Sequence, residues 1–222
     1  IIVIDQSSFN TLINQGYNNI KLLPNPLVPD VEEIIKNSSI KRGKNKIVFA
    51  GHVVPTKGVF ELVQACKDIT DIEVHILGAA TAEMKSRLYE AAGNNKTWLK
   101  ITGEQNYETV IKEMLSANIF VLPTYTEGFP NVILESMACG CPIIASAVGA
   151  IPEMLNIDGD EPAGICIEPK NIEQLKSAII KILNDDKLAS TFGNNAKKRV
   201  NEMYSMPSVW KQMTDIWKSV IE

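Results

Sequence analysis

The residues of this chain best suited to chemistry lie in one segment, between residues 123 and 135. It reads Pro-Thr-Tyr-Thr-Glu-Gly-Phe-Pro-Asn-Val-Ile-Leu-Glu and follows an apolar stretch, 119–122, that is typical of a buried strand. Pro130 suits the first position of a helix. The backbone N–H groups around it are then expected to point outward: those of Gly128, Phe129, Asn131 and Val132. N–H groups at the positive end of a helix form an arrangement that binds phosphate.

Two glutamates flank this predicted phosphate site. Glu135 lies between apolar and small residues of the helix, where a partly buried carboxylate requires hydrogen-bond donors. The two hydroxyls of a ribose supply two such donors. Glu127 precedes the helix, on the loop that would hold a group beyond the phosphates. Without the rest of the segment, the more frequent interpretation would be structural: Glu127 as an acid at a helix start and Glu135 as a surface acid.

The elements that must position these residues follow a regular order from residue 47 onward. Apolar strands ended by glycine alternate with segments whose apolar residues have helical spacing, which indicates βαβ units and a doubly wound parallel α/β sheet. The predicted strands are 47–50, 72–77, 98–102, 119–122, 142–146 and 165–167. The predicted helices are 59–69, 81–92, 107–117, 130–139 and 151–156, with three more beginning near 171, 187 and 207. Such sheets bind ligands beyond the carboxyl ends of their strands, so the loops after residues 50, 77, 102, 122 and 146 are the candidate site.

The first 46 residues have a different pattern. Residues 1–5 read as a buried strand and 20–23 as another short strand, and Ser7 or Ser8 is expected to cap a short helix that stops at Gly16. The prolines of 24–29 predict a break in regular structure, and the polar, basic stretch 38–46 predicts a solvated connection. We therefore expect a domain boundary between about residues 25 and 46.

Composition excludes several classes of protein. The chain has 222 residues, 45% hydrophobic and 22% charged, which excludes a disordered tail, a collagen or a coiled coil. The net charge of −4 gives no overall attraction for nucleic acid, and no apolar run approaches the roughly 20 residues that span a bilayer. The four cysteines form no Cys-x-x-Cys pair and indicate buried, reduced thiols, as expected in the cytoplasm.

Several motifs together resemble the family 4 retaining glycosyltransferases, which are nucleotide-sugar enzymes of the two-domain GT-B architecture. Glu127 and Glu135, separated by seven residues and followed by Ala-Cys-Gly-Cys-Pro at 138–142, resemble the family signature. The segment 49–58, Phe-Ala-Gly-His-Val-Val-Pro-Thr-Lys-Gly, is similar to the loop after the first strand. The segments 101–103 and 146–153 resemble further loops, and Pro-Asn-Pro at 24–26 stands where the family has its interdomain Pro-Asn-Gly.

The resemblance implies a role for each matching residue. Lys57 would contact the donor diphosphate, which the N–H groups from Gly128 to Val132 would also cradle. Glu135 would hold the ribose hydroxyls, and Gly103 would lie beside the base. Glu127 would be the catalytic residue that binds and orients the transferred sugar.

The resemblance also implies an organisation and partners. Residues 1–25 would be the end, or remnant, of an acceptor-binding amino-terminal domain, and 26–46 a linker. Residues 47–206 would form the nucleotide-sugar-binding domain. Residues 207–222 would form a helix that crosses back to the amino-terminal domain. The partners would be a nucleotide-sugar donor and, through the amino-terminal domain, a sugar or glycolipid acceptor in polysaccharide or glycolipid assembly. The protein would be cytoplasmic, with contact to the inner face of the membrane possible only through that domain.

No metal or cofactor is implied beyond the nucleotide-sugar substrate. Asp-Gly-Asp at 158–160 matches the letters of the Asp-x-Asp motif of metal-dependent glycosyltransferases, but its loop contains glycine and proline and is typical of a turn.

One departure from the family keeps alternatives open. His52 occupies the position of the family's usual arginine, and histidine brings fewer donors and no permanent charge. This change weakens a phosphate clamp or makes it dependent on pH. A non-catalytic nucleotide-sugar-binding module is therefore an alternative. A GT-B sugar-nucleotide epimerase, an isomerase on the same fold, is a second alternative, although the spacing of the two glutamates argues against it. A nicotinamide-binding Rossmann domain is disfavoured, since no Gly-x-Gly-x-x-Gly follows the first strand of the regular region.

Overall fold

A parallel six-stranded sheet forms the centre of the molecule. The structure is a computed structural model that describes residues 1–221 of the chain. The strands lie in the order β5-β4-β3-β6-β7-β8, and all neighbouring pairs are parallel. They are β3 (Lys46–Ala50), β4 (Glu73–Leu77), β5 (Leu99–Gly103), β6 (Ile119–Leu122), β7 (Ile143–Ser146) and β8 (Gly164–Ile167). The chain order reverses between β3 and β6, so the carboxyl ends of these strands border a crevice.

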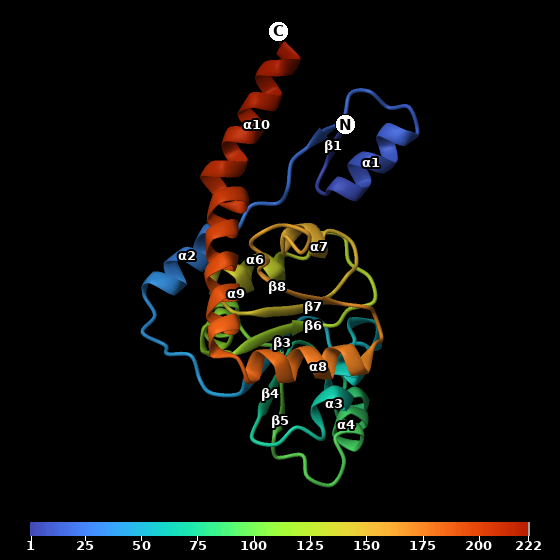
Figure 1. The fold of residues 1–222 in the computed structure, drawn as a ribbon, viewed down its shortest axis with the longest axis vertical. Helices are drawn as coiled ribbons and strands as arrows, with labels where there is room; N and C mark the ends of the chain where they lie inside the picture. The colour runs from blue at the N-terminus through green and yellow to red at the C-terminus, as the bar shows by residue number, and fades with distance from the viewer. Residues whose placement is uncertain (222) are drawn as a thin grey trace.

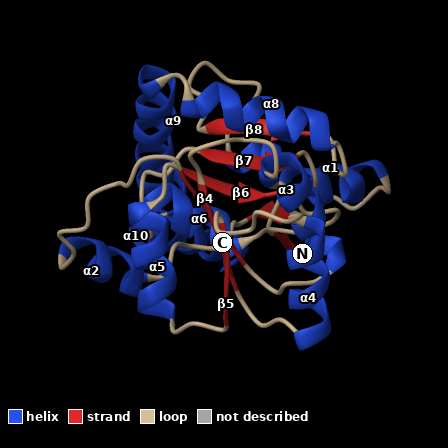
Figure 2. Cartoon of the chain, turned by 90° about the horizontal axis from the view of Figure 1, so that it is seen from below, coloured by secondary structure: helices blue, strands red, loops and turns tan. Residues whose placement is uncertain are grey.

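Helices cover both faces of the sheet, as its apolar strands require. Ile47, Phe49 and Phe120, on the central strands β3 and β6, are fully buried. Figure 2 shows one group of helices on each side of the strands: α2, α5, α6 and α9 on one side, α3 and α4 on the other, with α8 packed against α3. The helices of the regular region are α3 (Val59–Cys66), α4 (Ala82–Ala91), α5 (Tyr107–Ser116), α6 (Asn131–Ala138), α7 (Ile151–Met154), α8 (Ile172–Leu183) and α9 (Asp186–Arg199). The predicted doubly wound α/β fold is confirmed.

Most helix boundaries lie within one residue of the predicted ones; the larger differences are at the ends of α3 and of α7, which stops at Met154 and not at residue 156. The helix expected over 59–69 ends at Cys66, three residues early. Pro130 precedes α6 instead of opening it, because its ψ of 110° is extended and the first helical residue is Asn131.

The first residues form a small unit of their own. Strands β1 (Ile2–Val3) and β2 (Lys21–Leu22), which precede and follow helix α1 (Gln6–Asn14) in the chain, pair in parallel. The prediction that the first strand is buried is wrong, since Ile2 is 52% exposed. The helix is capped by Asp5 and not by a serine: one Asp5 oxygen accepts from the Ser8 N–H at 2.8 Å and the other from the Ser8 hydroxyl at 2.7 Å. Aspartate is a favoured N-cap residue, and Asp5 precedes the helix, so its carboxylate can accept both bonds from Ser8. The serines lie inside the helix and cannot cap its start.

The segment expected to be an irregular linker contains a helix, α2 (Pro29–Lys36). Pro29 opens it, at a position where proline costs nothing because the first N–H of a helix has no intrahelical acceptor. Val31 is fully buried, and α2 packs against α5. The predicted break in regular structure is present over residues 23–28, which form neither helix nor strand, but the prediction is wrong at Pro29, which begins α2.

The chain closes with a long helix that leaves the sheet. A π-helical turn (Val200–Tyr204) follows α9, and α10 (Met206–Ile221) then extends away from the sheet in the direction of the amino-terminal unit (Figure 1). Glu222, the last residue of the helix predicted over 207–222, lies outside the described residues. Within residues 1–221, the helices are all too short or too polar to cross a bilayer.

Candidate active site

A cavity of about 570 Å³ opens at the carboxyl ends of the central strands. Ala50, Leu77 and Leu122 form its floor as the last residues of β3, β4 and β6. Most of the residues that the sequence singled out lie around it. The further lining residues are Gly51, His52, Lys57, Gly78, Ala79, Glu104, Gln105, Val110, Glu127, Pro130, Asn131, Val132 and Glu135.

Lys57 and Glu127 form an ion pair at this cavity, between the Nζ of the lysine and the Oε1 of the glutamate. Lys57 ends a single turn of 3₁₀ helix (Pro55–Lys57), and Gly58 follows it with a φ of 71°. A Cβ at Gly58 would collide with the carbonyl oxygen of Pro123, so only glycine allows the loops after β3 and β6 to approach this closely. The lysine and the glutamate, 70 residues apart in sequence, therefore lie within direct contact.

The loop that carries Glu127 is held from two sides. The Tyr125 N–H donates to the Thr56 carbonyl at 2.8 Å, on the side of Lys57. On the other side, the Ala150 N–H donates to the Gly128 carbonyl at 2.9 Å. Gly149, with a φ of 55°, passes so close to Glu127 and Gly128 that a side chain would collide with their carbonyl oxygens. The loop after β7 is thus a support for the loop after β6.

The first turn of α6 presents uncapped N–H groups to the cavity. Pro130 is its N-cap residue and provides no side-chain cap, and α6 has no acidic residue in its first turn. Asn131 and Val132, the first two helical residues, line the cavity, and N–H groups at these positions have no intrahelical acceptor. The Asn131 side chain accepts from the Asn25 side chain at 3.2 Å. This end of α6 can accept an anion without displacing a capping group.

Glu135 lies one turn further along α6, at the inner wall of the cavity. Its Oε1 accepts a hydrogen bond of 3.0 Å from the Tyr107 hydroxyl, the first residue of α5. Burial raises the pKa of the Glu135 carboxyl above its ordinary value, and the hydrogen bond from Tyr107 partly opposes this. The pKa of Tyr107 is raised by burial and by the nearby Glu135 charge, so its hydroxyl remains protonated and donates.

The structure brings together seven of the ten residues that the sequence proposed: His52, Lys57, Glu127, Pro130, Asn131, Val132 and Glu135. Gly103, Gly128 and Phe129 lie beside the cavity in sequence but are not part of its lining. The Phe129 ring points instead at Tyr204, with ring centroids 5.8 Å apart in an edge-to-face arrangement. Gly103 contributes through its backbone, since its carbonyl accepts from the Gly78 N–H at 2.9 Å.

Sequence reasoning did not single out several residues of the site. Glu104 and Gln105, from the loop after β5, and Gly78 and Ala79, which follow β4, line the cavity. Tyr107, at the start of α5, does not line it and joins the site through its hydrogen bond to Glu135. The rule that ligands bind beyond the carboxyl ends of strands points to these loops. It does not rank the residues within them, because their side-chain directions depend on packing.

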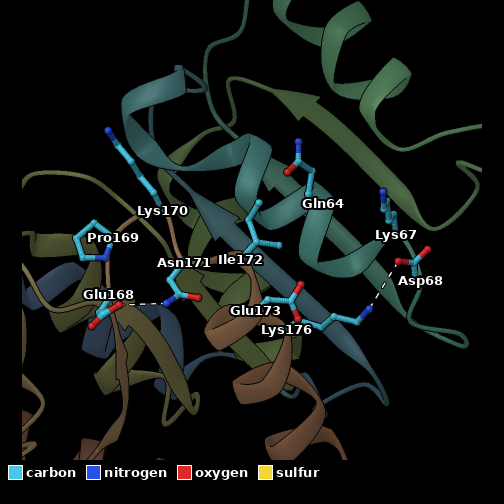
Figure 3. Close-up of a pocket in the computed structure, with 10 residues that line it drawn as sticks. All are labelled: Gln64, Lys67, Asp68, Glu168, Pro169, Lys170, Asn171, Ile172, Glu173 and Lys176. Carbon is cyan, nitrogen blue, oxygen red and sulfur yellow. Dashed lines mark hydrogen bonds and ion pairs between the residues drawn. The ribbon is translucent and has the colours of Figure 1, made fainter.

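A second hollow, of about 680 Å³, lies away from these residues, between α3 and the start of α8 (Figure 3). Its charges balance: Lys67, Lys170 and Lys176 face Asp68, Glu168 and Glu173. Lys176 pairs with Asp68 at 3.6 Å, and the Asn171 side chain donates to Glu168 at 3.1 Å. Gln64, Pro169 and Ile172 complete its lining. This hollow is a polar surface groove that has none of the candidate residues.

The two aspartates and four cysteines considered for metal or redox chemistry are not part of the cavity lining. Asp158 and Asp160 lie in the turns between α7 and β8, and within residues 1–221 no three His, Cys, Asp or Glu side chains gather as metal ligands would. The four cysteines are free thiols. Burial raises the pKa of Cys66 and of Cys141 to about 12, which makes these two thiols poor nucleophiles.

Comparison with known proteins agrees with this architecture. Residues 30–199 match the family model for glycosyl transferases group 1. The chain is 34% identical over 151 residues to an uncharacterized glycosyltransferase of Methanocaldococcus jannaschii, covering 68% of this chain and 42% of that protein. It is 28% identical over 185 residues to the capsular polysaccharide biosynthesis glycosyltransferase CapM of Staphylococcus aureus, covering 79% of this chain and 46% of CapM. The chain thus spans less than half the length of these two curated relatives.

Solved structures share the fold at lower identity. Sucrose-phosphate synthase from Thermosynechococcus elongatus superposes with a TM-score of 0.80 at 24% identity, covering 99% of this chain and 58% of that chain. HepE from Anabaena, solved in complex with UDP, has a TM-score of 0.80 at 18% identity, covering 98% and 63%. The fold is that of the carboxy-terminal domain of GT-B glycosyltransferases. Because the family model matches well over half of the chain, this protein belongs to the group 1 glycosyl transferases.

Proposed function

We propose that this chain binds the donor of a family 4 retaining glycosyltransferase. The donor is a nucleoside-diphosphate sugar held in the cavity at the carboxyl ends of β3, β4 and β6. The sugar is transferred with retention to a hydroxyl of a sugar or glycolipid acceptor. Capsular polysaccharide biosynthesis, named for the relative CapM, is the kind of process that such a reaction serves.

One observation carries the proposal: a cation, an uncapped helix start and two carboxylates meet around one cavity. Lys57 and the first turn of α6 are the groups that a diphosphate requires. Glu135, partly buried and exposed to the cavity, is an acceptor for ribose hydroxyls. Glu127 also lines the cavity, on the loop that would hold the sugar beyond the phosphates. The Anabaena HepE structures, which contain UDP and UDP-glucose, support a nucleotide-binding role for this fold.

The same groups would assist the chemistry. Transfer breaks the bond between the anomeric carbon and a phosphate oxygen, and negative charge builds up on the departing nucleoside diphosphate. Lys57 and the N–H groups of α6 are fixed donors aimed at that charge, and such donors lower the barrier. Glu127, which pairs with Lys57, would exchange this partner for hydroxyls of the transferred sugar when the diphosphate contacts the lysine.

Calorimetric titration of the chain with UDP, GDP and ADP tests the proposal. One of the three is expected to bind. Glu135→Ala should weaken the binding of that nucleoside diphosphate by roughly 1–3 kcal/mol, the value of hydrogen bonds to a charged group. Glu127→Ala should leave the affinity for the free nucleoside diphosphate nearly unchanged and lower the affinity for the corresponding nucleotide sugar. Absence of binding by all three, or equal losses for both ligands in both variants, would reject the proposal.

We further propose that donor binding requires no divalent metal. The Lys57 ammonium and the helix start already supply the positive potential that a metal would bring to the diphosphate. Affinity for the nucleotide sugar, measured by calorimetry with EDTA and then with magnesium, should agree within error. A gain of about tenfold with magnesium, roughly 1.4 kcal/mol, would contradict this.

A further inference from the structure

The hydrogen bond between Tyr107 and Glu135 lies at the cavity without a role in the proposed function. Within residues 1–221, the Tyr107 hydroxyl is the one group that donates to the Glu135 carboxylate, at 3.0 Å from Oε1. A carboxylate offers about four lone-pair positions, so Oε2 and one position on Oε1 remain for a ligand. These positions match the two hydroxyls of a ribose.

Both partners are held by the elements that carry them. Asn106 caps α5, with its side chain accepting from the Thr109 N–H at 2.8 Å, and this fixes Tyr107 as the first helical residue. Glu135 lies in α6 between Leu134 and Ser136, which are buried. The two helices pack against each other. The hydroxyl therefore reaches the carboxylate from a fixed direction.

We propose that Tyr107 is a positioning residue that sets the preference of this site for ribonucleotides. Its hydroxyl fixes the rotation of the Glu135 carboxylate, so that the free lone pairs face the 2′- and 3′-hydroxyls of the donor ribose. A glutamate side chain that is already ordered loses less conformational entropy when the ribose binds. The inference rests on the proposed function, because it concerns the ribose of the same donor.

A second tyrosine provides a matched control. The Tyr125 hydroxyl donates to Glu61 Oε1 at 2.6 Å, so it is also a tyrosine bonded to a glutamate. Neither Tyr125 nor Glu61 is part of the cavity lining. Tyr125→Phe removes a bond of the same kind without touching Glu135, and therefore separates loss of a hydrogen bond from loss of positioning.

The experiment compares the affinity of each variant for a nucleoside diphosphate and for its 2′-deoxy form. The probe is UDP with 2′-deoxy-UDP, or the matching pair for GDP or ADP if that base binds. The ratio of the two affinities is measured by calorimetry at one pH. Wild type is expected to prefer the ribose form by roughly 10- to 100-fold, the value of a hydrogen bond to a charged acceptor. Tyr107→Phe should reduce this preference by about three- to tenfold, while Tyr125→Phe keeps the wild-type ratio.

The outcomes separate the two proposals. If wild type binds no nucleoside diphosphate, the proposed function fails. If wild type shows a ribose preference that Glu135→Ala abolishes but Tyr107→Phe preserves, only the role of Tyr107 is overturned. Tyr107→Leu distinguishes the hydroxyl from the ring: a preference lost in the leucine variant but kept in the phenylalanine variant assigns the effect to the ring and also overturns the inference. Thermal melting of each variant verifies that it folds.

Discussion

Lys57 and Glu127 contact each other, although their proposed roles direct them to different parts of the donor. The ion pair lies at the cavity and is only partly exposed, with 27% of the lysine side chain and 14% of the glutamate side chain accessible. A diphosphate carries more negative charge than one carboxylate and would compete for the same ammonium group. In the proposed site, the ion pair would therefore link diphosphate binding to the freedom of Glu127 to turn to the sugar.

The ribose preference is expected to depend on pH through Glu135. Its pKa lies above the ordinary 4.5 because burial disfavours the charged carboxylate. Ribose hydroxyls donate best to the charged form, so the preference should fall as the pH drops through this raised pKa. Tyr107 and Cys139, which also influence this site, have raised pKa values and stay neutral in this range.

Affinity ratios of the ribose and deoxy ligands, measured from about pH 8 down to about pH 5, test this expectation. The terminal phosphate titrates in the same range, but it does so equally in both ligands and cancels in the ratio. Glu135→Gln, which carries no titrating carboxyl, should give a flat profile. A wild-type ratio that does not change with pH would contradict the assignment of Glu135 to the ribose.

At the scale of elements, the loop that carries Glu127 depends on neighbours that are remote in sequence. The 3₁₀ turn after β3 and the loop after β7 hold the loop after β6 between them. Two glycines allow the close approach: Gly58 against Pro123 and Gly149 against Glu127 and Gly128. The position of Glu127 is therefore fixed by backbone contacts on both sides.

Gly149→Ala is expected to displace this loop. The alanine Cβ would collide with two carbonyl oxygens, in addition to the roughly 1–2 kcal/mol that a left-handed conformation costs a non-glycine residue. We expect a loss of about 3 kcal/mol of unfolding free energy in urea, together with weaker binding of the nucleotide sugar. Gly93→Ala is the control, since Gly93 has a φ of 84° but a Cβ there meets no atom within 4 Å. It should lose only about 1 kcal/mol and bind normally; equal losses in both variants would show that the contact with Glu127 is unimportant.

At the scale of the whole molecule, few contacts within residues 1–221 connect the amino-terminal unit to the body of the molecule, which is the six-stranded sheet with its covering helices. The Gln6 N–H, at the start of α1, donates to the Glu153 side chain at 3.0 Å. The segment after the unit is anchored by the Leu27 N–H, which donates to the Tyr204 carbonyl at 2.7 Å. Stability of the body therefore depends mainly on its own sheet and on the polar groups buried against it.

Glu113 is the polar group whose removal should be most visible in the stability of the body. Its Oε2 lies 2.8 Å from His75 Nδ1 and 2.7 Å from Lys46 Nζ. The hydrogen bond with His75 and the Lys46 ammonium lower the pKa of Glu113 to about 2. A carboxylate with a lowered pKa stabilises the folded state above its unfolded pKa of 4.5, and this contribution disappears as the pH falls through about 2.

Glu113→Gln should therefore lose about 2 kcal/mol of unfolding free energy near neutral pH, and the difference from wild type should shrink below about pH 4.5. Chemical denaturation across this range measures it. Glu108→Gln is the control on the same helix: Glu108 pairs with Lys112 at 2.6 Å, but both side chains are largely exposed. Its loss should stay below about 0.5 kcal/mol, and a similar loss in both variants would argue against a special role for the partly buried Glu113.

The sequence by itself determined the order of strands and helices, because apolar periodicity and glycine stops are local properties. That order fixes a parallel sheet, and the sheet fixes the edge at which ligands bind. The spacing of Glu127 and Glu135 around one helix start also placed both at that edge. The start of α2 at Pro29 was missed although its signal is local, since proline both ends regular structure and begins helices.

Only the tertiary structure decided which side chains meet. Lys57 reaches Glu127, and Tyr107 reaches Glu135, across 70 and 28 residues of chain. Each contact depends on how two separate elements pack, and neither leaves a local pattern in the sequence. For the same reason Phe129 turned to Tyr204 and away from the cavity. Its neighbours in sequence set its backbone, but the direction of the ring was set by the apolar surface that the π-helical turn places beside it.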